Sequence, residues 1–144
     1  MSLWSFLFGV KATVNQISVV QLTNAQILAM HTTPVQLLPS PGPGKMILVS
    51  SIKAHYHYNN APFTGSPTLN IFYSGSVASP YATRNVSALA WNSSAEGMLP
   101  IPETGLFPWN QCVNQPLMVS LDGPVTGGGN SVVRIVVEYT VISP

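Results

Sequence analysis

The chain has 144 residues, of which only 6% are charged, and its five basic and four acidic side chains leave a net charge of +1. Free globular domains usually carry charge on about a quarter to a third of their surface, so this composition indicates a protein that is covered by other protein in an assembly. The basic residues are scattered along the chain, which argues against nucleic acid as a partner, because phosphate backbones need clustered cations.

Residues 1–16 are predicted to form an arm that docks on a neighbouring subunit, because a chain end is ordered only where something holds it. The apolar run Leu3–Val10 has no basic residue before it, unlike a secretory signal, and is far shorter than the roughly twenty residues of a membrane helix. Neither export nor a membrane partner is therefore expected. The alternative is that the run closes one end of the domain's own core. The side chains expected to make the contact are Leu3, Trp4, Phe6, Leu7 and Phe8.

Residues 17–144 are predicted to form a single domain, which begins with a loosely alternating strand at 17–22. Thr23 is a good N-cap for the helix formers that follow it, so one short helix is expected near residues 24–31. Pro34 ends this helix, because the residue before a proline is pushed out of the helical region.

A clear period of two begins after a turn of prolines and glycines at 39–44. The strand face predicted to point into the core carries Met46, Leu48, Ile52, Ala54, Tyr56 and Tyr58. The other face carries Ile47, Val49, Ser51, Lys53, His55 and His57. Further strands are expected near residues 35–37, 69–73, 81–91, 98–102, 117–121 and 131–142. The two prolines of the 98–102 segment confine it to a sheet edge or to irregular structure.

About eight strands are joined by proline- and glycine-rich turns, with one short helix and no alternation of strands with helices. This pattern predicts an all-β fold, an antiparallel β-sandwich. The number of strands is best matched by a jelly roll.

His55 and His57 lie two residues apart on one strand face, a spacing that allows both imidazoles to bind one metal ion. No cysteine or carboxylate is close in sequence to complete such a site, so neither a metal nor another cofactor is expected. The two histidines are instead interpreted as part of a polar sheet face or of a contact between subunits.

No motif for catalysis is present: the chain lacks Gly-x-Ser-x-Gly, a phosphate-binding loop and His-Glu-x-x-His. The protein is therefore not expected to be an enzyme. Glu138 is expected to form an ion pair with Arg134 on the same strand face, and the single cysteine, Cys112, is expected to be a small core residue.

Aromatic residues in three segments leave a sugar-binding surface open as an alternative. These segments are Phe63–Gly65, Trp91–Asn92 and Phe107–Asn110. Aromatic side chains of a β-sandwich more often belong to the core or to an interface, and that interpretation is preferred.

Several segments resemble small β-sandwich proteins encoded among bacteriophage virion genes. They are Leu22–Leu37 with the proline-glycine turn after it, the strand that begins at Lys45, Asn114–Leu117, the loop Gly127–Gly129 and the terminal strand Val133–Val141. The resemblance covers about residues 17–142, leaves the aromatic N-terminus outside, and supplies no catalytic residues.

The resemblance implies a virion protein that is made in the host cytoplasm and located on the capsid surface. Jelly-roll decoration or cement proteins of phage heads are similar in size and commonly form trimers. We therefore expect a homo-oligomer, with a trimer favoured, that binds the phage major capsid protein and stabilises the head. The alternative is a tail-fibre or receptor-binding module that recognises a host surface glycan. A structural protein of another virus and a binding module outside the virion are less favoured.

Overall fold

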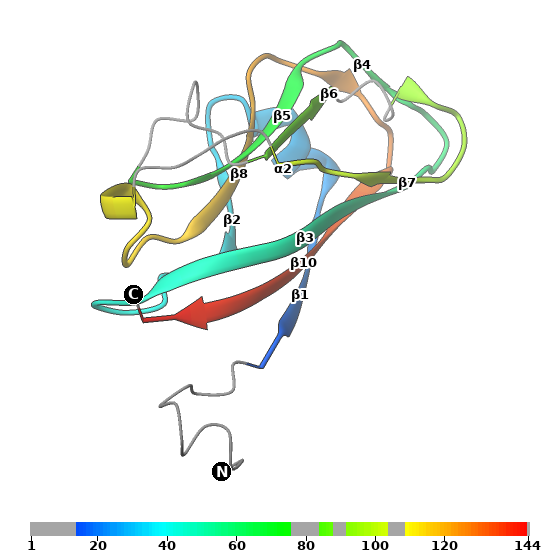
Figure 1. The fold of residues 1–144 in the computed structure, drawn as a ribbon. Helices are drawn as coiled ribbons and strands as arrows, with labels where there is room; N and C mark the ends of the chain where they lie inside the picture. Colours follow the sequence, from blue (N-terminus) through cyan, green and yellow to red (C-terminus); the bar gives the residue numbers. More distant parts are fainter. Residues whose placement is uncertain (1–13, 76–83, 88–91, 104–108, 144) are drawn as a thin grey trace.

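Two four-stranded antiparallel sheets face each other in the computed structural model, which describes residues 14–75, 84–87, 92–103 and 109–143 (Figure 1). The first sheet has the order β1 (Gln16–Leu22), β10 (Val132–Ile142), β3 (Met46–His57), β7 (Gly97–Pro100). The second has the order β2 (Val35–Leu38), β8 (Leu117–Leu121), β5 (Thr68–Tyr73), β6 (Arg84–Ser87). The remaining elements are helix α2 (Asn24–Ala29), the short strands β4 (Phe63–Thr64) and β9 (Thr126–Gly127), and the 3₁₀ turn η2 (Trp109–Gln111).

The eight strands of the two sheets are paired as in one long hairpin. In chain order the first pairs with the last, the second with the seventh, the third with the sixth and the fourth with the fifth. Successive pairs alternate between the two sheets, and contacts of β10 with β3 and of β8 with β5 complete each sheet. A long hairpin rolled in this way is a jelly roll. The prediction of an all-β antiparallel sandwich of jelly-roll type is therefore confirmed.

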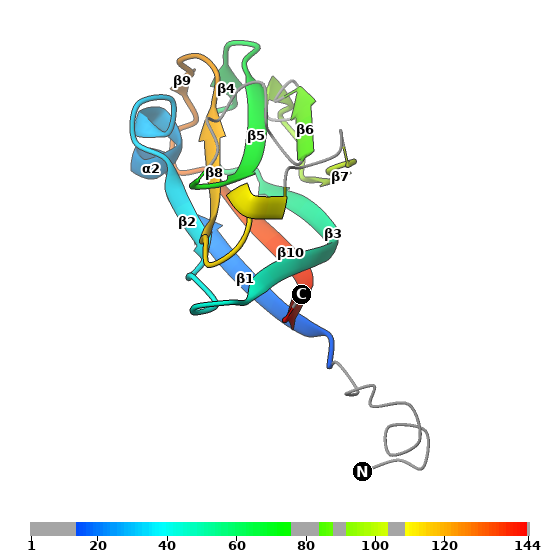
Figure 2. The same cartoon turned by 60° about the vertical axis from the view of Figure 1, so that its left-hand side comes forward.

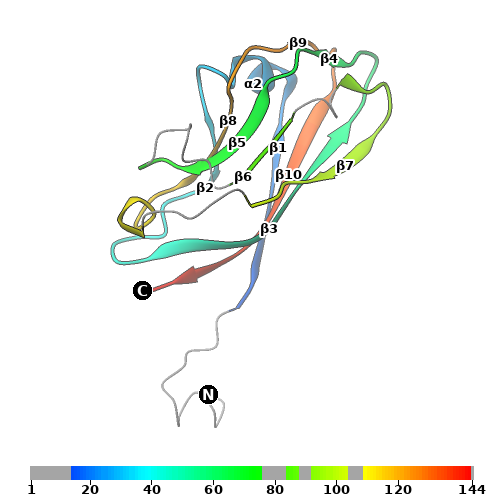
Figure 3. The same cartoon turned by 45° about the horizontal axis from the view of Figure 1, so that its top comes forward.

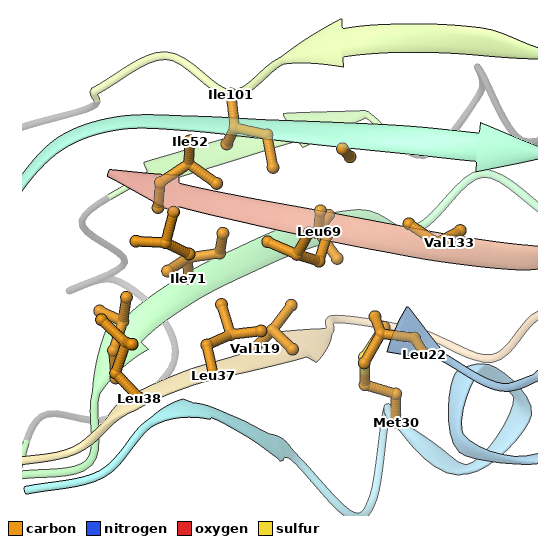
Figure 4. Close-up of a cluster of buried hydrophobic side chains, with 14 of the residues drawn as sticks. Leu22, Met30, Leu37, Leu38, Ile52, Leu69, Ile71, Ile101, Val119 and Val133 are labelled. Carbon is orange, nitrogen blue, oxygen red and sulfur yellow. The ribbon is translucent and has the colours of Figure 1, made fainter. Parts of the chain in front are cut away.

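The core lies between the two sheets, where aliphatic side chains from both interdigitate (Figure 4). Ile52 and Val133 of the first sheet face Leu69, Ile71 and Val119 of the second, and none of the five is more than 1% exposed (Figure 4). Burial of each such side chain contributes roughly 1.5–3 kcal/mol.

Helix α2 closes one end of this core. Thr23 is its N-cap, as predicted, and the structure adds a reciprocal capping box between Thr23 and Gln26. Ile27 and Met30 are fully buried beneath the helix. The views agree that α2, β4 and β9 lie together at this end, and that the start of β1 lies at the opposite end (Figures 1, 2 and 3).

The predicted alternation of strand β3 is correct for its second half and for Met46, which is buried, and wrong at Ile47 and Leu48. Ser51 pairs with Glu138 but Val49 pairs with Tyr139, so one extra residue, Ser50, sits in a β-bulge. A bulge of one residue exchanges the two faces of a strand. Ile47 is consequently buried, whereas Leu48, which we expected in the core, is 49% exposed.

Candidate interaction surface

The predicted arm lies largely outside the described residues. Leu3, Trp4, Phe6, Leu7 and Phe8 all belong to residues 1–13, so their role in an interface stays a prediction. In the described part of the chain, no helix has the length and apolar character needed to cross a membrane.

His55 and His57 lie on the outer face of the first sheet, as the strand pattern predicted, because their neighbours Ala54 and Tyr56 point into the core. Both histidines are partly buried. The strand register sets His55 between Arg134 of β10 and Met98 of β7. The two imidazoles therefore belong to a broad sheet face rather than to a pocket.

Glu96 supplies a carboxylate that sequence proximity did not reveal. The turn before β7 brings its Oε1 atom to 2.5 Å from Nδ1 of His57, although the two residues are far apart along the chain. Both side chains are about half exposed, at 45% and 55%. Among the residues that the structure describes, no three histidine, cysteine or acidic side chains come together in a way that could hold a metal ion.

The outer face of the first sheet gathers the exposed aliphatic side chains of the described chain. Four large hydrophobic residues on this face are strongly exposed: Ile17 at 68%, Val19 at 59%, Met98 at 65% and Leu48 at 49%. Val14, just before β1, is 75% exposed. No other large hydrophobic side chain in the described residues is as exposed. Ile17 and Val19 lie on edge strand β1 and Met98 on the opposite edge strand β7, so these side chains share one face but lie at its two edges.

Charged groups share this face. Lys53, Arg134 and Glu138 all point outward, since their strand neighbours are buried. Nε of Arg134 donates a hydrogen bond of 3.1 Å to Oε1 of Gln21 on β1. The predicted ion pair of Arg134 with Glu138 is wrong, because four residues along a strand separate them by about 13 Å.

Four connections at the α2 end are tied together by hydrogen bonds. Asn24 Nδ2 donates to the carbonyl of Gly127 at 3.0 Å, and the hydroxyl groups of Thr64 and Thr126 lie 2.6 Å apart. Asn92 Nδ2 donates to the carbonyl of Gly65 at 2.9 Å. This end is a hydrogen-bonded polar platform that also carries the exposed carboxylate of Asp122, which accepts a hydrogen bond of 2.7 Å from the main-chain N–H of Thr68.

The aromatic residues considered for sugar binding do not line this platform in the described part of the structure. Phe63 is completely buried beneath the loop of Gly128, and Tyr56 and Tyr73 are core residues. Trp91, Phe107 and the side chain of Trp109 fall outside the described part of the structure, so their role in sugar binding is untested.

A shallow apolar groove of about 450 Å³ runs between α2 and β2. It is lined by Ala25, Gln26, Ala29, Thr33, Pro34, Val35 and Gln36. None of these side chains can gain or lose a proton near neutral pH. The hydroxyl of Thr33 is the one weakly nucleophilic group among them. The lining is therefore suited to contact rather than to acid–base chemistry.

Comparison with known proteins gives a relationship at the level of fold. No protein-family model matches the chain, and no curated protein sequence is significantly similar to it. A chain in the solved structure of the cyanophage Pam1 capsid asymmetric unit is 15% identical, with a TM-score of 0.57 over 89% of this chain and 85% of that one. A chain of the Mud crab tombus-like virus is 9% identical over 90% and 78% of the two chains, but its TM-score of 0.34 is too low to bear on the fold. The jelly roll is thus shared with a chain of a phage capsid structure.

Proposed function

We propose that this protein is a non-enzymatic structural subunit of a phage particle, a decoration or cement protein that binds the lattice of the major capsid protein. The observation that carries the proposal is the outer face of the first sheet, where the exposed aliphatic side chains of a charge-poor jelly roll gather. The fold shared with a chain of the cyanophage capsid structure supports a place in the virion, on the surface of the head. Synthesis in the host cytoplasm follows from that assignment.

A charge-poor surface favours assembly because each ion buried at an interface costs several kcal/mol of desolvation. Lys53, Arg134 and Glu138, together with the partly buried His55 and His57, lie on this face among aliphatic, hydroxyl and amide side chains. The remaining area can pack against protein without stripping water from charges. This supports both self-association and binding to a capsid surface.

The same argument supports a closed homo-oligomer. A rotationally symmetric ring buries an apolar patch on every copy and leaves no open end, and a trimer is the state that we favour. We assign the aromatic side chains of residues 3–8 to contacts between subunits, together with the strand face of His55 and His57.

Co-sedimentation with phage heads tests the proposal. The full chain should form an oligomer and sediment with heads that lack it, and antibody against the chain should label heads rather than tail tips in electron micrographs. A chain lacking residues 1–10 should oligomerise or bind heads more weakly. Label confined to tail tips would overturn the head assignment, and a truncated chain that stays trimeric and still binds heads would overturn the role of the arm.

The described residues give the glycan-binding alternative little support. Stacking on sugar requires exposed aromatic rings, whereas Tyr56, Phe63 and Tyr73 are buried and Tyr58 is partly buried. A glycan array probed with the full chain should show no binding.

A further inference from the structure

We propose that the open edge of β1 is completed by residues 1–13 of a second copy of this chain, which add to the first sheet as a further strand. The proposal rests on the self-association proposed above and names the part of one subunit that receives the arm of the next.

Three of the four sheet edges are short, and two of these are limited by proline. Strands β2, β6 and β7 have four residues each. β2 lies between Pro34 and Pro39, and β7 ends at Pro100. Short strands and prolines are the usual means by which proteins keep an edge from pairing with another chain.

Strand β1 has none of this protection. It has seven residues, Gln16–Leu22, with no proline, glycine or charged side chain. One of its edges pairs with β10, and no strand in the described part of the chain pairs with the other. A long, uncharged, unpaired edge is a template for a strand from another molecule.

The side chains of the N-terminal segment match this edge. A strand added to β1 would extend the outer face and place its own side chains beside Ile17 and Val19, which are 68% and 59% exposed. Residues 3–8 carry no charge and no proline, and a period of two sets their three aromatic side chains on one face. Both sides of the contact are therefore apolar and uncharged.

The direction in which the chain enters β1 favours pairing of residues 1–13 with the β1 of a second copy over pairing with their own β1. Thr140 Oγ1 and Asn15 Oδ1 are joined by a hydrogen bond of 2.9 Å, which holds the chain in line with β1 just before its first paired residue. To return along its own β1, the chain would have to reverse within residues 9–13, where only Gly9 is a common turn residue. Val10 and Thr13 instead favour extended backbone.

Residues 1–13 are also long enough to reach the β1 edge of a second subunit. At about 3.3 Å per residue, thirteen residues span about 43 Å. Pairing of residues 3–8 uses about 20 Å of this, which leaves about 16 Å for residues 9–13 to cross from one subunit to the next. Each copy would give one arm and receive another, a head-to-tail contact that closes into a ring.

Lysine placed on the β1 edge tests the proposal in solution, without phage heads. Val19→Lys adds a charge at an exposed position and should weaken self-association by about tenfold or more, measured by sedimentation velocity over a range of concentrations. Ser66→Lys adds the same charge to an exposed loop position before β5, away from the β1 edge, and should leave self-association unchanged. Circular dichroism and thermal unfolding confirm that both variants are folded. Unchanged association of Val19→Lys would overturn the proposal.

Cross-linking identifies which chain supplies the arm. In a Cys112→Ala background, one tagged chain carries Phe6→Cys and a second, differently tagged chain carries Ile17→Cys, at an exposed position on the outer face of β1. A short thiol cross-linker should join the two different chains when they are mixed. If the mixture gives no joined product and a single chain with both cysteines cross-links internally, the arm binds its own β1 and the proposal is wrong. Because neither assay involves heads, a failure here leaves the capsid-binding function standing, and a failure of head binding leaves this contact standing.

Discussion

The hydroxyl of Tyr73 donates a buried hydrogen bond of 2.5 Å to the main-chain carbonyl of Ile47, and this bond joins the two sheets of the sandwich. Tyr73 is the last residue of β5 in the second sheet, and Ile47 lies near the start of β3 in the first. Most other contacts between the sheets are aliphatic. A directional polar contact in such a core fixes how the two sheets are placed at this end of the molecule.

Tyr73→Phe should lower the free energy of unfolding by about 1–2 kcal/mol, because it removes the hydroxyl and leaves the buried Ile47 carbonyl without that donor. Urea unfolding monitored by fluorescence measures the change. Tyr139→Phe is the matched control, since Tyr139 is partly buried on the first sheet and the same atom is removed. Equal stability of the two variants would show that the bond between the sheets contributes nothing.

Gly128→Ala should be far more damaging than Gly44→Ala. Both glycines have positive φ, +80° and +68°, a region that costs an L-residue about 1–2 kcal/mol. A Cβ at Gly44 meets nothing within 4 Å, whereas a Cβ at Gly128 would overlap the ring of Phe63. We expect a loss of about 1 kcal/mol for Gly44→Ala and about 3 kcal/mol or more for Gly128→Ala. Chemical unfolding of both variants checks this difference, and similar losses would contradict the packing of the loop on Phe63.

Local features of the fold could be predicted from the sequence because neighbouring residues determine them. Thr23 and the residues after it specify the N-cap and the helix, and the alternation of Ile52, Ala54 and Tyr56 specifies the buried face of β3. The number of strands and the lack of long helices then favoured a jelly roll.

Features that depend on pairing between distant segments could not be predicted in the same way. The bulge at Ser50 arises from the register of β3 against β10, and nothing in the alternation around Leu48 marks it. The approach of Glu96 to His57 likewise requires β7 to pair with β3. The gathering of Ile17, Val19 and Met98 on one face depends on the order of strands within the sheet.

Ile47→Ala and Leu48→Ala test the position of the bulge. Ile47 is 1% exposed and Leu48 is 49% exposed, the reverse of the simple alternation. Ile47→Ala should cost about 2–4 kcal/mol of stability, as truncation of a buried side chain does, while Leu48→Ala should cost less than about 1 kcal/mol. Chemical unfolding of the two variants measures both values. A larger loss of stability for Leu48→Ala than for Ile47→Ala would show that Leu48 is the buried residue and would contradict the bulge at Ser50.

The pair of His57 and Glu96 should contribute little to stability despite its short distance. Both side chains are about half exposed, and such pairs contribute at most about 1 kcal/mol because water screens them. A double-mutant cycle with His57→Ala and Glu96→Ala, followed by urea unfolding, should give a coupling energy below this value. A coupling energy of several kcal/mol would mean that the pair is shielded from water, which would contradict the exposure of both side chains.

Cys112 should be nearly unreactive in the folded protein. It is 1% exposed, and burial raises the pKa of its thiol, because a thiolate is poorly solvated in an apolar environment. Since the thiolate is the reactive form, a raised pKa leaves less of it at any given pH, and burial also blocks the reagent. The rate of alkylation by iodoacetamide, followed by mass spectrometry at pH 8, should rise by at least about tenfold when guanidinium unfolds the chain. Equal rates in the folded and unfolded protein would place the thiol at the surface and contradict its position beside η2 in the core.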